Sequence, residues 1–324
     1  MRYLFVLSAF IFLVFSGCDL FTNEQEKPSI PGKIVFSMPD GSENESYQIF
    51  AMNADGSDLV QLTSFEDQEA FDPSWSPDGK HIVFTSTMRS TSLGLAIHIM
   101  DANGENIQPM KLWPDSLHAY AGSNPVWSPD GTKIAFDWCV NCELQGKNSE
   151  IFIYDFKTDS VIQITDHLGS DRIPQWSTNG DRLSFISNRD YFEINDRQLD
   201  NDLYEHKSNE SILRRITLDG KTGVWTWNPN NQSYLIRSKE EPYHWYSLEP
   251  TSMDTLGELN LDIDIDISEL RPIKWSQNGK ILMLLKINYP KQIIYFYDFE
   301  IEQLLEGPII DNVSRIDWHY KENN

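Results

Sequence analysis

Short apolar runs separated by polar turns follow one another along most of the chain. Ile82–Phe84 and Ile134–Phe136 are such runs, and each is followed by a polar loop and a second apolar run, as at Ile97–Met100 and Ile151–Tyr154. β-branched and aromatic runs of this length, bounded by Gly, Pro, Asn and Asp, are typical of β-strands. The pattern therefore predicts an all-β protein built from short strands.

A tryptophan followed by a tight turn recurs at the same place in each group of runs. The clearest copies are Pro73–Lys80, with the sequence PSWSPDGK, and Pro125–Thr132, with PVWSPDGT. Degenerate copies contain Trp176, Trp227 and Trp275. The copies are about 50 residues apart and each spans four predicted strands, which is the period of a β-propeller blade. We expect the tryptophans to pack between neighbouring blades.

The two ends of the chain supply the parts of one more blade. Lys33–Ser37, Gln48–Met52 and Leu59–Thr63 match the second, third and fourth strands of a blade but lack a first strand. Val313–Trp318 matches that missing first strand and ends in a last tryptophan. Pairing of these segments closes the ring and removes free sheet edges. The prediction is a six-bladed β-propeller of four-stranded blades, closed by pairing of its N- and C-terminal strands.

The repeated motif is similar to that of the TolB β-propeller family. The hallmark of that family is Pro-x-Trp-Ser-Pro-Asp-Gly-Lys followed by an apolar strand, and the similarity extends over residues 32–320. The family's Ser-x-Arg segment after the second strand has counterparts at Thr87–Arg89 and Ser187–Arg189. The resemblance implies a TolB-like repeat propeller. The same repeat occurs in propellers attached to serine peptidases, but this sequence contains no Gly-x-Ser-x-Gly nucleophile elbow.

The N-terminus has the features of an export signal. After Arg2, the residues from Leu4 to Phe15 are apolar except for Ser8. A helix of this length spans about 18 Å, which is less than the hydrocarbon core of a bilayer. Phe15–Cys18 resembles the bacterial lipoprotein lipobox, which implies removal of residues 1–17 and attachment of lipid to Cys18. The alternative is an ordinary signal peptide with an incidental cysteine.

These features divide the chain into four parts. They are a lipoprotein signal peptide (1–17), a flexible tether (18–31), the propeller (32–320) and a short tail (321–324). No second apolar segment of spanning length follows the signal peptide. We expect an exported protein that is anchored in the bacterial cell envelope through its lipid alone, in the periplasm or at the cell surface.

The chain is strongly acidic. Lys and Arg number 26 and Asp and Glu number 49, for a net charge of −23. This balance argues against nucleic acid as a partner, because phosphate binding requires a basic surface, and it also argues against a polybasic membrane-binding patch. The acidity is compatible with solubility, with a basic partner and with cation binding, and does not choose among them.

Few residues point to metal or redox chemistry. Cys139 and Cys142 form a single Cys-x-x-Cys, for which a local disulfide is the expected state in an exported protein, with unpaired thiols or a metal or redox role as alternatives. The histidines share no metal-ligand spacing. The alternating aspartates of residues 262–266 lack the glycine and glutamate of an EF-hand. We predict no metal, no cofactor and no catalytic group.

The loops expected at one end of the propeller channel carry the candidate binding residues. Arginines and aromatic side chains gathered there would hold an acidic peptide or a glycan. We therefore predict a non-catalytic protein- or glycan-binding or scaffold module, with an envelope protein or glycan as its partner. The alternatives are ion pairs between blades for these residues, and a carbohydrate- or peptide-active enzyme with its site at the channel mouth. The candidates are Asp72, Arg89, Tyr120, Trp138, Asp171, Arg172, Arg189 and Arg271.

Overall fold

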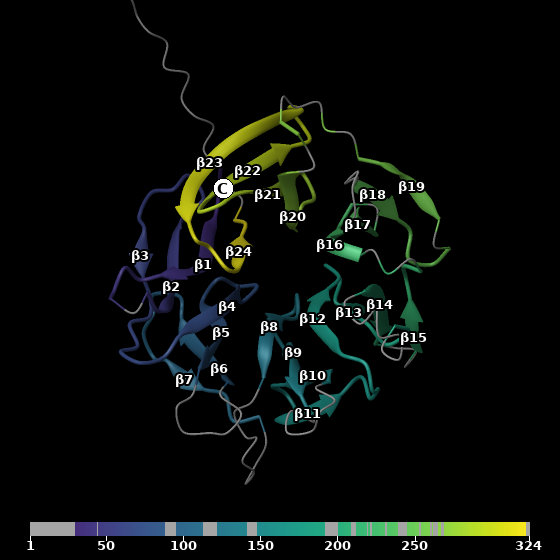
Figure 1. Cartoon of the computed structure of the whole chain (residues 1–324), viewed down its shortest axis with the longest axis horizontal. Helices are drawn as coiled ribbons and strands as arrows, with labels where there is room; N and C mark the ends of the chain where they lie inside the picture. Colours follow the sequence, from purple (N-terminus) through teal and green to yellow (C-terminus); the bar gives the residue numbers. More distant parts are fainter. Residues whose placement is uncertain are drawn as a thin grey trace, which may run out of the picture.

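Six four-stranded antiparallel sheets surround a central axis in the structure, which is a computed structural model of the chain (Figure 1). This arrangement confirms the predicted six-bladed β-propeller. The residues described below include no α-helix, so none of them forms a helix able to cross a bilayer. The structure describes residues 30–43, 45–87, 95–112, 122–140, 148–191, 200–208, 212–218, 220, 222–230, 232–238, 245–252, 254–259, 261, 265–266 and 269–321.

The strands of blades 2 to 6 follow one another in sequence from the axis to the rim. In blade 2, for example, β4 lies at the axis and β7 at the rim (Figure 1). These five blades comprise β4 (Ala70–Trp75), β5 (His81–Thr87), β6 (Leu95–Asp101) and β7 (Gln108–Pro109); β8 (Ser123–Trp127), β9 (Lys133–Cys139), β10 (Ser149–Asp155) and β11 (Ser160–Gln163); β12 (Asp171–Trp176), β13 (Arg182–Ser187), β14 (Asp202–Lys207) and β15 (Ile212–Arg215); β16 (Thr222–Asn228), β17 (Ser233–Ser238), β18 (Trp245–Leu248) and β19 (Thr255–Glu258); and β20 (Leu270–Trp275), β21 (Ile281–Asn288), β22 (Lys291–Asp298) and β23 (Gln303–Asp311).

Blade 1 is assembled from both ends of the described chain, as predicted. Its innermost strand β24 pairs antiparallel with β1, with Lys33 opposite His319 and Phe36 opposite Ile316. The pairing continues beyond β24, because the backbone N–H of Ser37 donates to the carbonyl of Arg315 at 3.1 Å. The ring therefore closes without a free inner edge. The strands of this blade are β24 (Ile316–His319), β1 (Lys33–Pro39), β2 (Tyr47–Asn53) and β3 (Val60–Gln61).

The residues just before β1 also belong to this closure. Ile30 is buried in a cluster with Trp318 and residues of β1 and β2. The indole N–H of Trp318 donates to the carbonyl oxygen of Pro31 at 3.2 Å. Packing of the chain against the propeller thus begins before the predicted boundary at residue 32, because an apolar residue and a carbonyl acceptor are available there.

The repeated turn has the chemistry that its sequence predicts. In blade 2 the N–H of Gly79 donates to the carbonyl of Ser76 at 2.9 Å, and Gly79 has a φ of 67°. Ser76 Oγ donates to Asp78 Oδ1 at 2.7 Å and accepts from the N–H of His81 at 2.9 Å. The serine, the acidic residue and the glycine therefore each satisfy one requirement of a tight connection between two strands.

The repeat tryptophans pack between neighbouring blades, which confirms the prediction. Trp75 of blade 2 lies in a buried cluster with Val35 and Ile49 of blade 1. Trp275 of blade 6 lies in a cluster with Leu235 of blade 5. A tryptophan buries a large apolar area, so each one is a principal contact at its blade junction.

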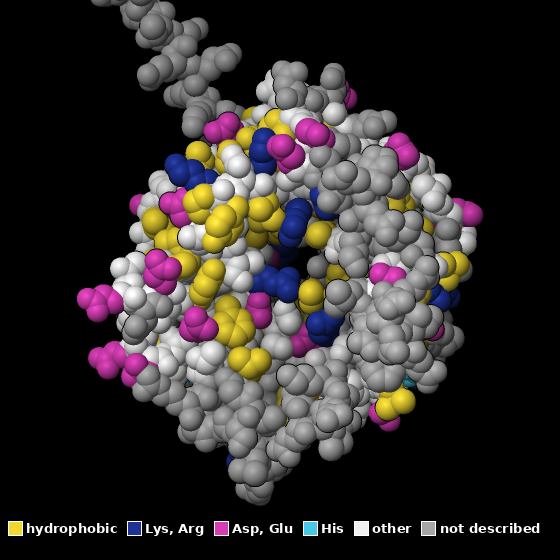
Figure 2. Space-filling view, in the orientation of Figure 1, with side chains coloured by type: hydrophobic (Ala, Val, Ile, Leu, Met, Phe, Trp, Pro, Cys, Tyr) yellow, Lys and Arg dark blue, Asp and Glu magenta, His cyan; other side chains and the backbone are white. Residues whose placement is uncertain are grey.

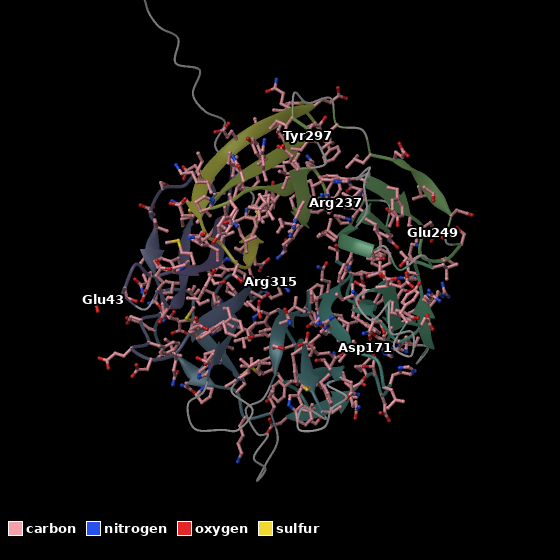
Figure 3. The ribbon with its side chains drawn as sticks, in the orientation of Figure 1. Glu43, Asp171, Arg237, Glu249, Tyr297 and Arg315 are labelled. Atoms are coloured by element: carbon pink, nitrogen blue, oxygen red, sulfur yellow. The ribbon has the colours of Figure 1, made fainter. Side chains whose placement is uncertain are left out.

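The ring has two faces that differ in their connections. The turn face carries the turns after the innermost strands, such as Ser76–Gly79, and the mouth face carries the beginnings of these strands. Figures 2 and 3 view the mouth face, and Figure 3 labels Arg237 near the end of β17 and Arg315 just before β24.

Candidate functional site at the channel and its mouth

The central channel is lined by all six repeat tryptophans. Its cavity has a volume of about 510 Å³ and reaches from Pro77 on the turn face to Asp72 and Arg315 on the mouth face. Tryptophan has a rigid aromatic surface with two rotatable bonds, so the wall is preformed. The six residues are Trp75, Trp127, Trp176, Trp227, Trp275 and Trp318.

Bulges interrupt the inner strands three residues before the tryptophan. The pairing of β4 with β5 shifts between Phe71 and Ser74, and Asp72 within this bulge has a φ of 53°. Asn124 and Ile173 occupy the same position in blades 3 and 4, with φ values of 50° and 57°. A left-handed φ is especially unfavourable for the β-branched Ile173. Bulges of this kind redirect side chains, here at the level of the channel mouth.

A chain of polar contacts joins blades 1 to 4 at this level. Arg315 lies 3.3 Å from Asp72 Oδ1 and donates to Asn124 Oδ1 at 3.1 Å. Asn124 Nδ2 donates to Asp137 Oδ2 at 2.9 Å, and the backbone N–H of Ile173 donates to the same oxygen at 2.9 Å. The bulged backbone of Ile173 is therefore held by a buried carboxylate of the preceding blade.

Of the carboxylates in this chain of contacts, Asp137 is buried and Asp72 is partly buried, with its side chain 15% exposed. Burial raises the pKa of Asp137 to about 6, although hydrogen bonds led by that from Ser123 oppose the rise. Burial also raises the pKa of Asp72, and the charge of Arg315 opposes this effect. Both carboxylates are engaged by protein donors, so their chemistry is that of structural acceptors.

A second set of contacts joins blades 6, 1 and 2. Lys274 Nζ lies 2.6 Å from Asp317 Oδ1. The backbone N–H of Trp75 donates to Asp317 Oδ2 at 2.8 Å. A single carboxylate thus connects a lysine of one blade to the inner strand of another, which fixes the three blades around the channel.

Three exposed arginines stand at the mouth. Arg172 and Arg271 are the second residues of β12 and β20, and Arg315 precedes β24. The side chain of Arg315 is 43% exposed, and Arg172 and Arg271 are also exposed. Within the described ranges, neither Arg172 nor Arg271 has an ion-pair partner. Figure 2 shows basic side chains around the opening of a chain whose net charge is −23.

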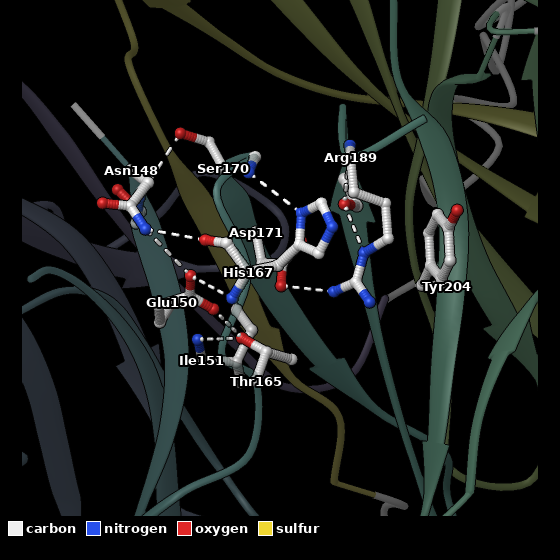
Figure 4. A network of polar contacts seen from close by, with 12 residues as sticks. Asn148, Glu150, Ile151, Thr165, His167, Ser170, Asp171, Arg189 and Tyr204 are labelled. Carbon is white, nitrogen blue, oxygen red and sulfur yellow. Dashed lines mark hydrogen bonds and ion pairs between the residues drawn. The ribbon is translucent and has the colours of Figure 1, made fainter. Parts of the chain in front are cut away.

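Asp171 and Arg189 form an ion pair inside blade 4 (Figure 4). Asp171 is fully buried, and its Oδ2 lies 2.5 Å from a terminal nitrogen of Arg189. Arg189 Nε donates to Ser187 Oγ at 3.0 Å, and the guanidinium lies 4.7 Å from the centre of the Tyr204 ring. The pair connects strands of a single blade rather than two blades, because both residues lie where β12 and β13 run side by side.

A buried acceptor near the start of the third strand anchors the end of the fourth strand. In blade 3, Glu150 accepts from Thr165 Oγ1 at 2.6 Å and from the N–H of His167 at 2.9 Å (Figure 4). Gln48 and Asp202 accept from the equivalent threonines of blades 1 and 4. Burial raises the pKa of Glu150 to about 7. The threonine found at the end of several predicted fourth strands thus has a structural role.

The structure changes the expected position of most candidate residues. Asp72, Trp138, Asp171, Arg172 and Arg271 were expected in loops but lie within strands, because the inner strands continue past their bulges to the mouth face and β9 extends to Cys139. Arg189 lies two residues beyond the end of β13. Arg89 and Tyr120 lie outside the described residues.

Trp138 and Cys139 lie in β9 and are engaged in structural contacts. Trp138 packs on Phe152 with ring centres 5.5 Å apart, in the cluster between blades 2 and 3. Cys139 is disulfide-bonded. Cys142 lies outside the described residues, so its pairing with Cys139 stays a prediction, and so does lipid attachment at Cys18, which also lies outside them. The described part of the chain holds no group of three or more His, Cys, Asp or Glu arranged for a metal ion.

Sequence reasoning missed Arg315, Asn124 and Asp137. Arg315 and Asn124 stand three residues before a repeat tryptophan, the same position as Asp72. Comparison of this position across the repeats would have identified both. Asp137 gave no such signal, because its partners come from another strand of its own blade and from the next blade.

The fold and the channel define a class, namely a closed six-bladed β-propeller whose inner strands carry a repeated tryptophan. A sequence profile of the TolB beta propeller domain matches residues 32–283. The chain therefore belongs to the TolB β-propeller family.

Individual proteins match parts of this chain. It is 31% identical over 117 residues to the uncharacterized peptidase YuxL of Bacillus subtilis and 36% identical over 67 residues to the Tol-Pal system protein TolB of Alcanivorax borkumensis. These matches cover 35% and 21% of this chain but only 17% and 14% of the relatives. The crystal structure of TolB from Acinetobacter baumannii is similar with a TM-score of 0.65 at 17% identity, covering 90% of this chain and 68% of that one. This last similarity concerns the fold.

Proposed function

We propose that the protein is a non-catalytic binding module that holds an acidic segment of a cell-envelope protein at the mouth of its channel. The observation that carries the proposal is the exposure of Arg172, Arg271 and Arg315 around the mouth of an otherwise acidic protein. Guanidinium groups bind carboxylates through paired hydrogen bonds. The local positive charge also favours the approach of an anion, whereas the remaining surface repels it.

The state of the channel carboxylates supports a binding role rather than catalysis. Asp72 pairs with Arg315, Asp317 pairs with Lys274, and Asp137 accepts hydrogen bonds from Asn124. General acid–base catalysis requires a titratable group within reach of the substrate. Here the carboxylates are used to hold blades together.

The expected location of the protein is the second part of this proposal. The export signal and the lipobox-like segment ending at Cys18 support lipid anchoring in the cell envelope. Cys18→Ala should release the protein from the membrane fraction of its native host. Membrane association of that variant at the wild-type level would contradict the anchor.

Binding at the mouth is tested with a blocked tetraglutamate peptide and calorimetry. We expect binding that weakens as salt rises, and an affinity about tenfold lower for Arg172→Gln/Arg271→Gln, the loss of about one charge-assisted contact. Lys157→Gln/Lys280→Gln, which removes two charges from the turn face, is the control and should bind as the wild type does.

Three outcomes of this experiment are informative. Absence of peptide binding, or equal binding by the mouth variant, would refute the acidic-segment proposal. Binding of tetragalacturonate in place of the peptide would identify an acidic glycan as the ligand. Hydrolysis or elimination of either compound would refute the non-catalytic role.

A further inference from the structure

We propose a second binding site, on the turn face between blades 2 and 3, that receives a cationic side chain, an arginine or lysine of a partner protein. It is independent of the mouth. The site is a crevice with a volume of about 440 Å³. Its walls combine a stacked aromatic pair with two carboxylates. Its principal residues are Pro77, Asp78, His81, Trp127, Asp130 and Phe156, and we call this set the turn-face crevice.

The aromatic wall of the crevice is exposed to solvent. Phe156 directly follows β10, and 41% of its surface is exposed. It stacks on Trp127 with ring centres 5.4 Å apart and planes inclined by 8°, and Tyr154 meets it edge-on at 4.9 Å. The rings therefore hold one another in place while a hydrophobic surface faces water. A preformed aromatic face of this kind attracts a cation.

Blade 6 contains the same aromatic group in a covered state. Phe299 stacks on Trp275 with ring centres 5.0 Å apart, and Tyr297 meets it edge-on at 4.7 Å. There Phe299 is only partly exposed and packs against a buried cluster. The aromatic triad is thus a repeated structural unit, and its exposure in blade 3 is the departure that requires explanation.

The space that is open in the crevice is filled by a side chain at two other blade junctions, whereas the junction between blades 3 and 4 is open at Gly180 in the same way. Between blades 5 and 6, Asn230 Nδ2 donates to the carbonyl of Gly279 at 2.8 Å, and a Cβ on Gly279 would lie 2.2 Å from Asn230 Oδ1. Between blades 1 and 2, His319 lies against Gly79, where a Cβ would be 2.6 Å from its Nε2. A Cβ on Gly131 would meet no atom closer than Pro77 Cδ, at 3.8 Å.

Two carboxylates give the open crevice its charge preference. Hydrogen bonds from Ser76 lower the pKa of Asp78. Burial acts to raise the pKa of Asp130, but hydrogen bonds from Ser128 and Thr132 outweigh it and lower the pKa. Both groups are therefore ionised at neutral pH.

The cation that pairs with Asp78 is exchangeable. Lys80 Nζ lies 3.5 Å from Asp78, and the lysine side chain is 75% exposed. Such a surface pair contributes little free energy and is easily replaced. A guanidinium or ammonium group lying on the aromatic face and between the carboxylates would form a cation–π contact and charge-assisted hydrogen bonds together. A neutral sugar would stack on the same aromatic face and donate hydroxyl hydrogen bonds to the carboxylates, but it would form no ion pair with them.

The repeats provide substitutions that remove the charge without disturbing the turn. Asn179 and Asn278 replace the turn aspartate in blades 4 and 6. They accept from Ser177 Oγ at 2.8 Å and from Ser276 Oγ at 2.7 Å, as Asp78 accepts from its serine. Asp78→Asn/Asp130→Asn should therefore fold normally.

The test measures binding of a blocked triarginine peptide by calorimetry at low salt. We expect wild-type protein to bind it, and Asp78→Asn/Asp130→Asn and Phe156→Ala each to bind about tenfold more weakly, as expected for loss of a cation–π or charged contact. Glu300→Gln/Glu302→Gln removes two carboxylates from the same face of blade 6 and should change nothing. A blocked tricitrulline peptide, which is neutral, should not bind.

Further measurements distinguish a peptide side chain from other ligands and from non-specific attraction to an acidic protein. Equal weakening by the control variant would show non-specific attraction to an acidic protein and would overturn the site. Binding of chitotetraose with full affinity to the aspartate variant would overturn it in favour of a glycan. If arginine amide binds as tightly as the peptide, the ligand of the crevice is a small cationic compound. That result would refute the proposal of a partner protein. Arg172→Gln/Arg271→Gln should bind triarginine normally, so the two sites fail independently.

Discussion

The buried carboxylate of Asp137 provides the sharpest test of the structure. It is 2% exposed and accepts hydrogen bonds from Asn124 and from the N–H of Ile173 on one oxygen. Asp137→Asn preserves the shape of the side chain. The amide oxygen can accept the same two hydrogen bonds, and the amide nitrogen can donate to Ser123, which now donates to Asp137.

The magnitude follows from the pKa of this group. Burial raises it from 3.8 to about 6 in the folded protein, which corresponds to about 3 kcal/mol. Because the folded protein binds the proton more tightly than the unfolded chain, the stabilising contribution of Asp137 is complete below about pH 4. It is lost as the pH rises through about 6. The variant has no such loss, so its stability relative to wild type should increase by about 3 kcal/mol from pH 3.5 to pH 8.

Urea unfolding followed by tryptophan fluorescence at sub-micromolar concentration measures this difference across the pH range. Asp55 is the control, because hydrogen bonds from Ser57 lower its pKa. Asp55→Asn should change relative stability in the opposite direction, with the wild-type advantage lost as the pH falls. A pH-independent difference for Asp137→Asn, or one that favours wild type as pH rises, would refute the burial argument.

Four further single substitutions and one double substitution test the closure, the turns and the ion pair of blade 4, each by the same unfolding measurement. Trp318→Ala should lower the free energy of unfolding by about 3–5 kcal/mol because it leaves a cavity in the closing blade, and a loss below about 1 kcal/mol would contradict the closure. Gly131→Ala and Gly279→Ala each introduce a Cβ at positive φ, which costs about 1 kcal/mol of unfolding free energy. Gly279→Ala should cost more because its Cβ meets the side chain of Asn230. Equal losses for the two variants would contradict the difference between the two blade junctions. Arg189→Met should lower the free energy of unfolding by about 3 kcal/mol because it leaves Asp171 buried without its partner. Asp171→Leu/Arg189→Met should recover most of this loss. Additive losses from the two substitutions would contradict the ion-pair argument.

The blades and their closure were predictable because they depend on local patterns. A strand buried between blades requires an apolar run, a tight turn requires the Ser-Pro-Asp-Gly chemistry, and both recur with one period. The C-terminal segment ending in Trp318 has the inner-strand pattern, and only one blade lacked such a strand. Pairing of Ile316 with Phe36 therefore followed from counting, although more than 250 residues separate them.

The channel mouth was only partly predictable because it is formed by residues from different blades. Arg172 and Arg271 were identified, but their placement in loops was wrong because sequence patterns do not show that inner strands extend past a bulge. In the sequence, nothing distinguishes Arg189 from Arg172 and Arg271 as a candidate binding residue at the mouth. Its side chain is nevertheless engaged by Asp171, since those two residues meet only when β12 and β13 pair.

Differences between blades at equivalent positions indicate where the protein departs from a purely structural ring. An acceptor near the start of the third strand is glutamine, glutamate or aspartate in blades 1, 3 and 4, yet it makes the same threonine contact each time. Those differences leave the geometry unchanged and need no functional explanation. Phe156 and Phe299 are the reverse case, because the residue is identical and the surroundings differ. Burying an aromatic ring is favourable, so the cationic side chain proposed for the turn-face crevice would gain free energy by covering Phe156, which is 41% exposed.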